Sequence, residues 1–391
     1  MAEQMVLPVA GRELVERVRG LLPLLAEQAA EAERLRQPTD TCIRALEASG
    51  VFRLMVPRCY GGLELDLDTF LEVGLLLGEA DTSMAWVTTF CVEHNWMLCQ
   101  FPESFQRELY RERSHVLAPG AIAPSGRVRR EAGGFRLTGR WQWGTGVMHA
   151  SWVIVGAAPD GGDLGDLRFF ALPIEEVKVE DTWYVDGMVG TGSNDIVIDD
   201  VLVPEERSVP IAAMVSGQAH GASLHGSPLY GTPMIPILML AASMPIIGQA
   251  RAVVRGFRQR LEEHVRLGST RQQAEKPASQ MRLARAHLEQ YQAERLLRDV
   301  VAEVLERRGA ASIEERVRWS TWVTHAVHQA RRVVQDVSEA SGASAHFLDH
   351  SLQRALRDVN VASCHVAFDV DARLELYGRQ LLGLEPTTAL F

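Results

Sequence analysis

Residues 190–206 read GTGSNDIVIDDVLVPEE, and this stretch decides the fold. Small residues open it, and an apolar run of strand length follows until Pro204. A glycine-rich loop that binds a dinucleotide follows a strand and opens a helix, whereas the glycines of GMVGTG at residues 187–192 open a strand. We therefore assign these glycines to turn geometry, and the stretch to a β domain that is not a Rossmann fold.

Further strand signals place this stretch inside a β block that runs from about residue 115 to 213. Gly133-Gly134 lies between VRREA and FRLTGRW, and a glycine pair between alternating segments is typical of a β-hairpin. Two more segments of strand length, SWVIVGA and LRFFALPI, precede the opening stretch, with glycine-rich turns between them. We expect a compact antiparallel block that ends near Pro210.

Helices flank the β block on both sides. A first helix is predicted from apolar residues at helical spacing, and others at residues 40–48, 68–79 and 82–100, of which the last is apolar almost all round and therefore buried. Residues 214–234 are rich in Gly, Ser, His and Pro and predict a loop. The apolar positions of the first helix and of two later helices are Leu14, Val18, Leu21, Leu25, Ala29 and Ala32; Met281, Ala284, Leu288 and Tyr291; and Val323, Ala326, Ala330, Val333 and Val337.

Composition argues against several classes of function. The 391 residues are 47% hydrophobic, enough for a core of two or three layers, and a net charge of −10 without a dense basic run argues against nucleic-acid binding. Five scattered cysteines without a CxxC pair favour reduced thiols in a cytoplasm. No signal peptide is evident, and Pro236 and Pro245 interrupt the longest apolar stretch, 233–252, so no membrane span is expected.

The order of helices, a small β domain and long helices resembles the acyl-CoA dehydrogenase superfamily from about residue 12 to 385. Three motifs carry the resemblance: GTGSNDIVIDDVLVPEE at 190–206, GRWQWGTG at 139–146 and MVPRCYGGLEL at 55–65.

This resemblance implies an α+β protein with the acyl-CoA dehydrogenase-like fold. Its parts are an N-terminal helical domain (1–114), a middle small antiparallel β domain that contacts flavin (115–213), and a C-terminal four-helix bundle (214–391) with an oligomer interface. The long C-terminal helices carry more apolar surface than one chain obviously covers, which suggests a homotetramer of the family type.

The carboxylate that acyl-CoA dehydrogenases use as a base is missing from this chain. In the commonest subfamilies that Glu follows an Arg-Asp pair, which corresponds here to Arg357-Asp358. His365 and Val366 stand where the family has Tyr-Glu or its equivalents, and Asp369, the nearest carboxylate, is out of step. The alternative family position, at residues 236–243, holds no carboxylate.

Residues 340–369 instead resemble the two-component flavin-dependent monooxygenases of the same fold, which include hydroxylases of 4-hydroxyphenylacetate, steroid-derived phenols and indoles. The resemblance implies an oxygenase that hydroxylates a phenolic, polycyclic or indolic substrate through a flavin hydroperoxide. It would use O2 and reduced FMN supplied by a separate flavin reductase, with FAD as the other possibility. An N- or S-oxygenase, a flavin oxidase and a flavin-binding structural partner remain as alternatives.

His365 and His94 are the predicted catalytic residues. Flavin hydroperoxide attacks an aromatic ring faster when a phenol is deprotonated, and a histidine exchanges protons near neutral pH. The site must otherwise exclude water. His94 lies on the predicted buried helix, from which many relatives line their substrate cavity. An ordinary buried histidine is the alternative at both positions.

The resemblance also implies residues that bind flavin. Thr145 would hydrogen-bond the central ring nitrogen of flavin, with Gly146 beside it and Trp143 packing near the ring. Ser125 falls where the family has a loop under the flavin, and Arg271 where a neighbouring subunit approaches the flavin phosphate.

No metal site is predicted. His346 and His350 have the i, i+4 spacing of two ligands on one helix face, but no Glu or third ligand completes a motif.

Overall fold

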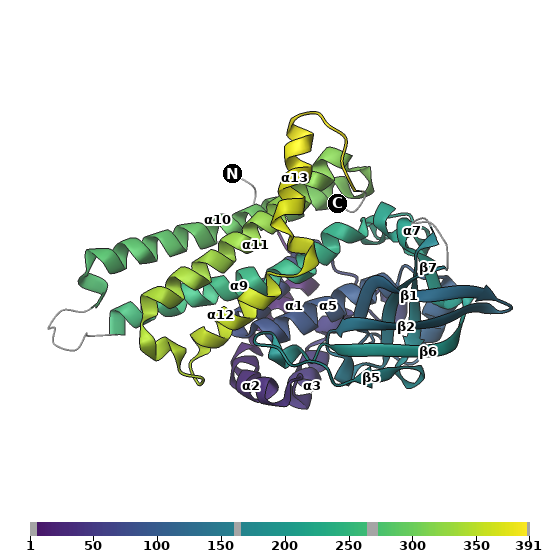
Figure 1. Ribbon diagram of the computed structural model, residues 1–391, viewed down its shortest axis with the longest axis horizontal. Coiled ribbons are helices and arrows are strands. Elements are labelled where there is room, and N and C mark those ends of the chain that lie inside the picture. Colours follow the sequence, from purple (N-terminus) through teal and green to yellow (C-terminus); the bar gives the residue numbers. More distant parts are fainter. Residues whose placement is uncertain (1–5, 160–165, 264–272, 389–391) are drawn as a thin grey trace.

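A computed structural model describes residues 6–159, 166–263 and 273–388 of the chain. A helical bundle occupies one end of an elongated molecule and a β-sheet the other, with the N-terminal helices packed beneath both (Figure 1). The helices are α1 (Val9–Arg19), α2 (Leu22–Leu35), α3 (Asp40–Ser49), α4 (Leu67–Ala80), α5 (Thr82–Leu98), α6 (Glu103–Leu109), α7 (Ile211–Ser216), α8 (His220–Leu224), α9 (Met234–Glu263), α10 (Pro277–Arg307), α11 (Ile313–Ser341), α12 (Ser351–Ala362) and α13 (Val370–Leu381).

The strands form one mixed sheet in the order β5-β6-β2-β1-β3-β4-β7. Their bounds are β1 (Gly120–Glu131), β2 (Gly134–Gly144), β3 (Trp152–Pro159), β4 (Arg168–Pro173), β5 (Lys178–Glu180), β6 (Asn194–Pro204) and β7 (Ser208–Pro210). The hairpin predicted at Gly133-Gly134 joins β1 to β2. The expectation of an antiparallel block is wrong at one pairing, because β3 returns to the free edge of β1 and runs parallel to it.

Local signals explain where the N-terminal helices begin and end. Thr39 caps α3, which stops at Gly50 in a left-handed conformation (φ 81°) that glycine adopts without strain. Asp81 caps α5 by accepting the N–H of Met84. The first predicted helix is two helices, because Gly20 ends α1 and Pro23, which cannot donate an N–H, stands in the first turn of α2.

Two expectations for residues 214–263 are also corrected. The predicted loop at 214–234 contains the end of α7, all of α8 and the short 3₁₀ helix η8 (Pro228–Gly231). The sequence predicts that Pro245 interrupts the apolar stretch 233–252. Instead, the 30-residue helix α9 continues through it.

By length and composition alone, helix α9 could cross a membrane, whereas the sequence predicted no such segment. No other helix of the described residues meets this criterion. However, 83% of its apolar window is buried inside the protein, as expected of a core helix. Gly78 of α4 and Gly248 of α9 pack face to face, since a Cβ on Gly248 would lie 2.2 Å from the carbonyl oxygen of Leu75. This close backbone contact ties α9 to the N-terminal helices.

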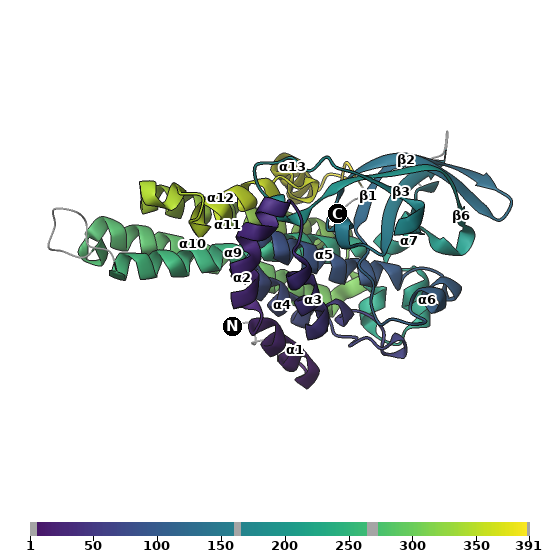
Figure 2. The same cartoon turned by 90° about the horizontal axis from the view of Figure 1, so that it is seen from below.

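Two hydrophobic cores hold the molecule together. One core lies within the sheet, while the other is shared by the N-terminal helices and the C-terminal bundle of α9, α10, α11 and α12. Helix α5 is buried along its whole length and lies between the bundle and the sheet (Figure 2). The α+β prediction is confirmed, and domain borders at residues 114 and 213 stay a prediction.

Candidate active site

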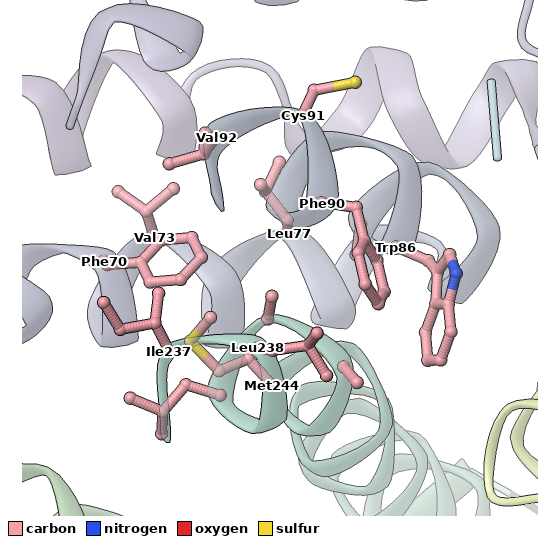
Figure 3. Packing of buried hydrophobic residues seen from close by; sticks show 14 of the residues in the cluster. Phe70, Val73, Leu77, Trp86, Phe90, Cys91, Val92, Ile237, Leu238 and Met244 are labelled. Carbon is pink, nitrogen blue, oxygen red and sulfur yellow. The ribbon is translucent and has the colours of Figure 1, made fainter. Parts of the chain in front are cut away.

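Helix α5 carries an aromatic row around which the candidate site is built. Trp86, Phe90 and His94 are spaced four residues apart, so their side chains leave the same side of the helix. The ring centroids of Trp86 and Phe90 lie 4.9 Å apart, and those of Phe90 and His94 lie 5.6 Å apart. Figure 3 shows Trp86 and Phe90 projecting together from α5, beside the apolar packing against α9.

His365 meets this aromatic row from a distant part of the chain. It follows the end of α12 and immediately precedes the 3₁₀ helix η12 (Val366–Phe368). Its ring centroid lies 5.6 Å from that of Trp86 and 6.2 Å from that of Phe90. The structure therefore brings the two predicted catalytic histidines, His94 and His365, to the same aromatic residue, Phe90.

The hydrogen bonding of His365 decides which ring nitrogen is free. Nδ1 accepts the backbone N–H of Ala367 at 3.2 Å, so the neutral ring carries its proton on Nε2. His365 is half-buried among aromatic rings, and this desolvation lowers its pKa to about 4, which keeps the ring neutral near pH 7. His365 therefore presents an N–H donor rather than a resting base.

His94 and its neighbour Glu93 form a buried pair with open hydrogen-bonding capacity. His94 Nε2 lies 3.2 Å from Glu93 Oε2, but both oxygens of Glu93 and the Nδ1 of His94 have no hydrogen-bond partner in the described chain. Burial lowers the pKa of His94 to about 4 and raises that of Glu93 to about 8, so both groups are neutral near pH 7. Nε2 packs against β1, since a Cβ on Gly120 would lie 2.6 Å from it, and Nδ1 is the nitrogen left open.

Thr145, at the end of β2, belongs to a buried chain of hydroxyl groups. Its Oγ1 lies 3.1 Å from Ser193 Oγ, which in turn lies 2.7 Å from Thr191 Oγ1. Gly192 between them adopts a left-handed conformation (φ 58°), and this turn leaves the Thr191 and Ser193 hydroxyls within hydrogen-bond reach of each other. We call Thr145, Ser193 and Thr191 the hydroxyl chain.

The hydroxyl chain adjoins the aromatic row. A Cβ on Gly146, next to Thr145, would lie 3.1 Å from Val87 of α5, and Val87 directly follows Trp86. Gly146 and the hydroxyl chain therefore lie near the Trp86 end of the aromatic row, the end that His365 also contacts.

Trp143 stands out for its backbone and its exposure. It has a left-handed conformation (φ 66°), which is strained for a tryptophan, and 63% of its surface is exposed. Strained backbone and an exposed aromatic ring together are features that functional sites retain. The ring is thus available to pack on a flat ligand such as flavin.

Asp358 anchors the hydroxyl chain to α12. Its Oδ1 accepts the N–H of Met188 at 2.6 Å, and its Oδ2 accepts from Ser83 Oγ at 3.2 Å. The carbonyl of Met188 accepts the hydroxyl of Thr191 at 2.8 Å. Burial, with the nearby Asp81 carboxyl, raises the pKa of Asp358 to about 7.

The remaining predicted positions lie elsewhere. Ser125 is exposed within β1 rather than in a loop, and its hydroxyl donates to the carbonyl of Arg140. Arg271 lies outside the described residues. His346 and His350 do not share a helix face, because His346 ends the 3₁₀ helix η11 (Ala343–His346) whereas His350 caps α12.

Among the described residues, none near the position of the dehydrogenase base is suited to remove a proton from an acyl-CoA thioester. Val366 is 80% exposed, and Asp369 caps α13 by accepting the N–H of Ala372. Glu93 is the carboxylate nearest His94, and its raised pKa keeps it protonated near neutral pH. A neutral carboxylic acid does not remove a proton from a thioester, so the geometry agrees with the missing base.

Sequence reasoning missed four residues that the structure brings to this site. Trp86 and Phe90 could have been found from their i, i+4, i+8 spacing with His94. Glu93 is a charged residue inside an apolar helix, which is itself a signal of function. In the sequence, Asp358 serves only to align the Arg-Asp pair with the family. Nothing local in the sequence indicates that it binds Met188.

The chain and its fold are similar to known flavin-dependent hydroxylases. A family model described as the acyl-CoA dehydrogenase C-terminal domain matches residues 240–370. A pigment production hydroxylase from a Rhodococcus species is 35% identical, with 95% of this chain and 97% of the relative covered. The oxygenase subunit HsaA of a flavin-dependent monooxygenase from Rhodococcus jostii is 31% identical, with 96% and 100% covered. The crystal structure of XiaF from a Streptomyces species, in complex with FADH2 and glycerol, superimposes with a TM-score of 0.89 at 28% identity, with 97% of each chain covered.

Proposed function

Since the chain belongs to the family of oxygenase components of two-component flavin-dependent monooxygenases, which share the acyl-CoA dehydrogenase-like fold, we propose that it hydroxylates an aromatic substrate bound beside α5 and His365. The observation that carries the proposal is the row of Trp86, Phe90 and His94 facing His365. Aromatic rings of a substrate pack favourably on such a row. A phenolic, polycyclic or indolic ring system fits this surface chemistry.

Reduced flavin, when bound, supplies the two electrons that activate O2, so that one oxygen atom enters the substrate and the other leaves as water. The chain's own residues fit this group, because the Thr145 hydroxyl and the exposed ring of Trp143 lie on one strand end next to the aromatic row. Thr145, Gly146 and Trp143 are the proposed flavin residues. We favour FMN delivered by a separate reductase, and FAD is the alternative that the FADH2 complex of XiaF supports.

The two histidines are proposed to divide the handling of protons. His365 keeps its proton on Nε2 and offers it as a hydrogen bond to the reacting oxygen. His94 offers the unpartnered Nδ1 as an acceptor for a hydroxyl or N–H of the substrate. Because the pKa of each ring is lowered to about 4, both stay neutral and keep these roles across the neutral pH range.

The test mixes the protein with reduced FMN or FAD and then with oxygen, in the presence of phenols, indoles and polycyclic aromatics. Expected results are a delay before oxidised flavin reappears and a product heavier by one oxygen atom. Reoxidation as fast as that of free flavin, with all oxygen recovered as hydrogen peroxide, contradicts the proposal. Bleaching of bound flavin by acyl-CoA thioesters without oxygen would point to a dehydrogenase instead.

We also propose a homotetramer in the cytoplasm. Support for the assembly is the apolar stripe of Met281, Leu288 and Tyr291 on α10, each 55–65% exposed in one chain. Support for the location is that all five cysteines are unpaired.

A further inference from the structure

The protons of the hydroxyl chain point in one direction, and the anchor of the chain decides that direction. Each hydroxyl carries one proton. The carbonyl oxygen of Met188 can only accept, so Thr191 must donate its proton to Met188. Ser193, 2.7 Å away, must then donate to Thr191, which has no proton left to give.

The same reasoning fixes the proton of Thr145. Because the proton of Ser193 is committed to Thr191, the 3.1 Å contact between Ser193 and Thr145 is made with the proton of Thr145. The three hydroxyls are buried, with exposed fractions of 1–7%, so bulk water does not reorder them. Thr145 therefore offers a ligand only the lone pairs of its oxygen.

We propose that Ser193 and Thr191 are positioning residues that make the site select reduced over oxidised flavin. The inference rests on the proposed contact between Thr145 and the central ring nitrogen of flavin. In reduced flavin that nitrogen, N5, carries a hydrogen and donates to a lone pair. In oxidised flavin N5 has only a lone pair, so it finds no donor on Thr145.

This polarity suits a protein that takes up reduced flavin from solution and returns oxidised flavin to a reductase. A free threonine hydroxyl would rotate and bind either form equally well. The hydrogen bonds of the hydroxyl chain remove that freedom. Met188, whose N–H is held by Asp358 and whose carbonyl accepts from Thr191, keeps the direction of the chain from reversing. Neither Ser193 nor Thr191 is proposed to touch the flavin. Ser193 acts through Thr145, and Thr191 acts through Ser193.

The experiment measures anaerobic dissociation constants of reduced and oxidised FMN, and then of FAD, for the intact protein and its variants. Ser193→Ala frees the proton of Thr145, so the preference for reduced over oxidised flavin should fall by about twofold to tenfold, the value of one net hydrogen bond. Thr191→Val frees the proton of Ser193 and should have the same effect. Thr191→Ser keeps the donor and should restore the wild-type preference.

Thr138→Ala is the matched control, because it removes an exposed hydroxyl from the same strand β2, where it only accepts the N–H of Asp200. An unchanged preference in folded Ser193→Ala and Thr191→Val overturns the inference and leaves the proposed function intact. A wild-type protein that binds reduced flavin no better than Thr145→Val overturns the contact with Thr145 and the inference with it. A wild-type protein that binds neither flavin overturns the proposed function as well.

Discussion

At the scale of single residues, His365 has two tasks that mutation can separate. Its ring faces Trp86 and Phe90, and its Nδ1 also caps η12 through Ala367. His350 performs only the second task, because its Nδ1 accepts the N–H of Leu352 at the start of α12 at 3.1 Å. The chain thus contains its own control for capping by a histidine.

His365→Ala should lower the hydroxylation rate by about 100- to 1,000-fold, the usual effect of losing a hydrogen-bond donor to an oxygen on which charge develops. Hydrogen peroxide should be released in place of product, because flavin is still reoxidised. The measurements are product and peroxide yields after single turnover, with circular dichroism to show that the variant is folded. His350→Ala should lose a helix cap and some stability but keep the wild-type product yield. If His365→Ala also kept the wild-type product yield, His365 would have no role in the reaction.

Glu93 predicts a pH dependence of stability. Its pKa is raised to about 8 in the folded protein from about 4.5, so the folded state holds a proton that the unfolded chain releases as pH rises through this window. Stability conferred by the protonated group is full below about pH 4.5 and is lost progressively up to about pH 8. Glu93→Gln keeps a neutral side chain throughout, so its melting temperature relative to wild type should rise between pH 5 and pH 8.

The expected gain at pH 8 is at least about 1 kcal/mol, or a few degrees in melting temperature. Glu13→Gln, at an exposed position of α1, should show the same offset from wild type at every pH. A Glu93→Gln offset that does not vary with pH would mean that Glu93 is ionised inside the protein, paired with a protonated His94 at 3.2 Å.

At the scale of elements, α12 links the two halves of the site. Its carboxyl end leads into His365, and Asp358 on the same helix holds Met188 and through it the hydroxyl chain. Gly187 fits against the helix because a Cβ there would lie 2.2 Å from the carbonyl oxygen of Arg357. A shift of α12 would therefore disturb both the histidine and the flavin contact.

Asp358→Ala should loosen the Met188 loop, because a buried N–H left without an acceptor costs about 1–3 kcal/mol. Asp358→Asn retains an oxygen acceptor and should lie between Ala and wild type. The measurements are reduced-flavin affinity and the delay in flavin reoxidation. Glu315→Ala removes a carboxylate that accepts the N–H of Ser312 at the exposed start of α11 and should change neither. Wild-type flavin behaviour in folded Asp358→Ala would show that α12 does not set the loop.

At the scale of the whole molecule, the exposed stripe on α10 predicts an assembly. Leu288→Glu with Tyr291→Glu places two charges on the apolar surface and should convert the proposed tetramer to smaller species, as measured by size exclusion with light scattering. Arg282→Glu, exposed on α10 outside the stripe, should leave the assembly unchanged. If the neighbouring subunit completes the flavin site, the dissociated protein should also bind flavin more weakly. A wild-type protein that is monomeric would contradict the prediction directly.

The sequence by itself determined the features that depend on local pattern or on motif. Alternation and glycine placement predicted the β1–β2 hairpin, helical spacing predicted α3, α4 and α5, and the motifs at 139–146 and 190–206 predicted the fold and the flavin chemistry. It also indicated the absence of a dehydrogenase base, because that argument needs only the identity of the residues near Val366.

Only the tertiary structure decided how residues far apart in the chain divide the work. Phe90 and His365 are 275 positions apart, as are Ser83 and Asp358, and no periodicity relates such pairs. The parallel pairing of β3 with β1, the continuation of α9 through Pro245 and the direction of the hydroxyl protons likewise depend on neighbours from other elements. Packing brings these groups together because burying apolar surface is favourable over the whole chain at once. The neighbours that each buried polar group meets then determine whether it donates or accepts a hydrogen bond and which tautomer a histidine adopts.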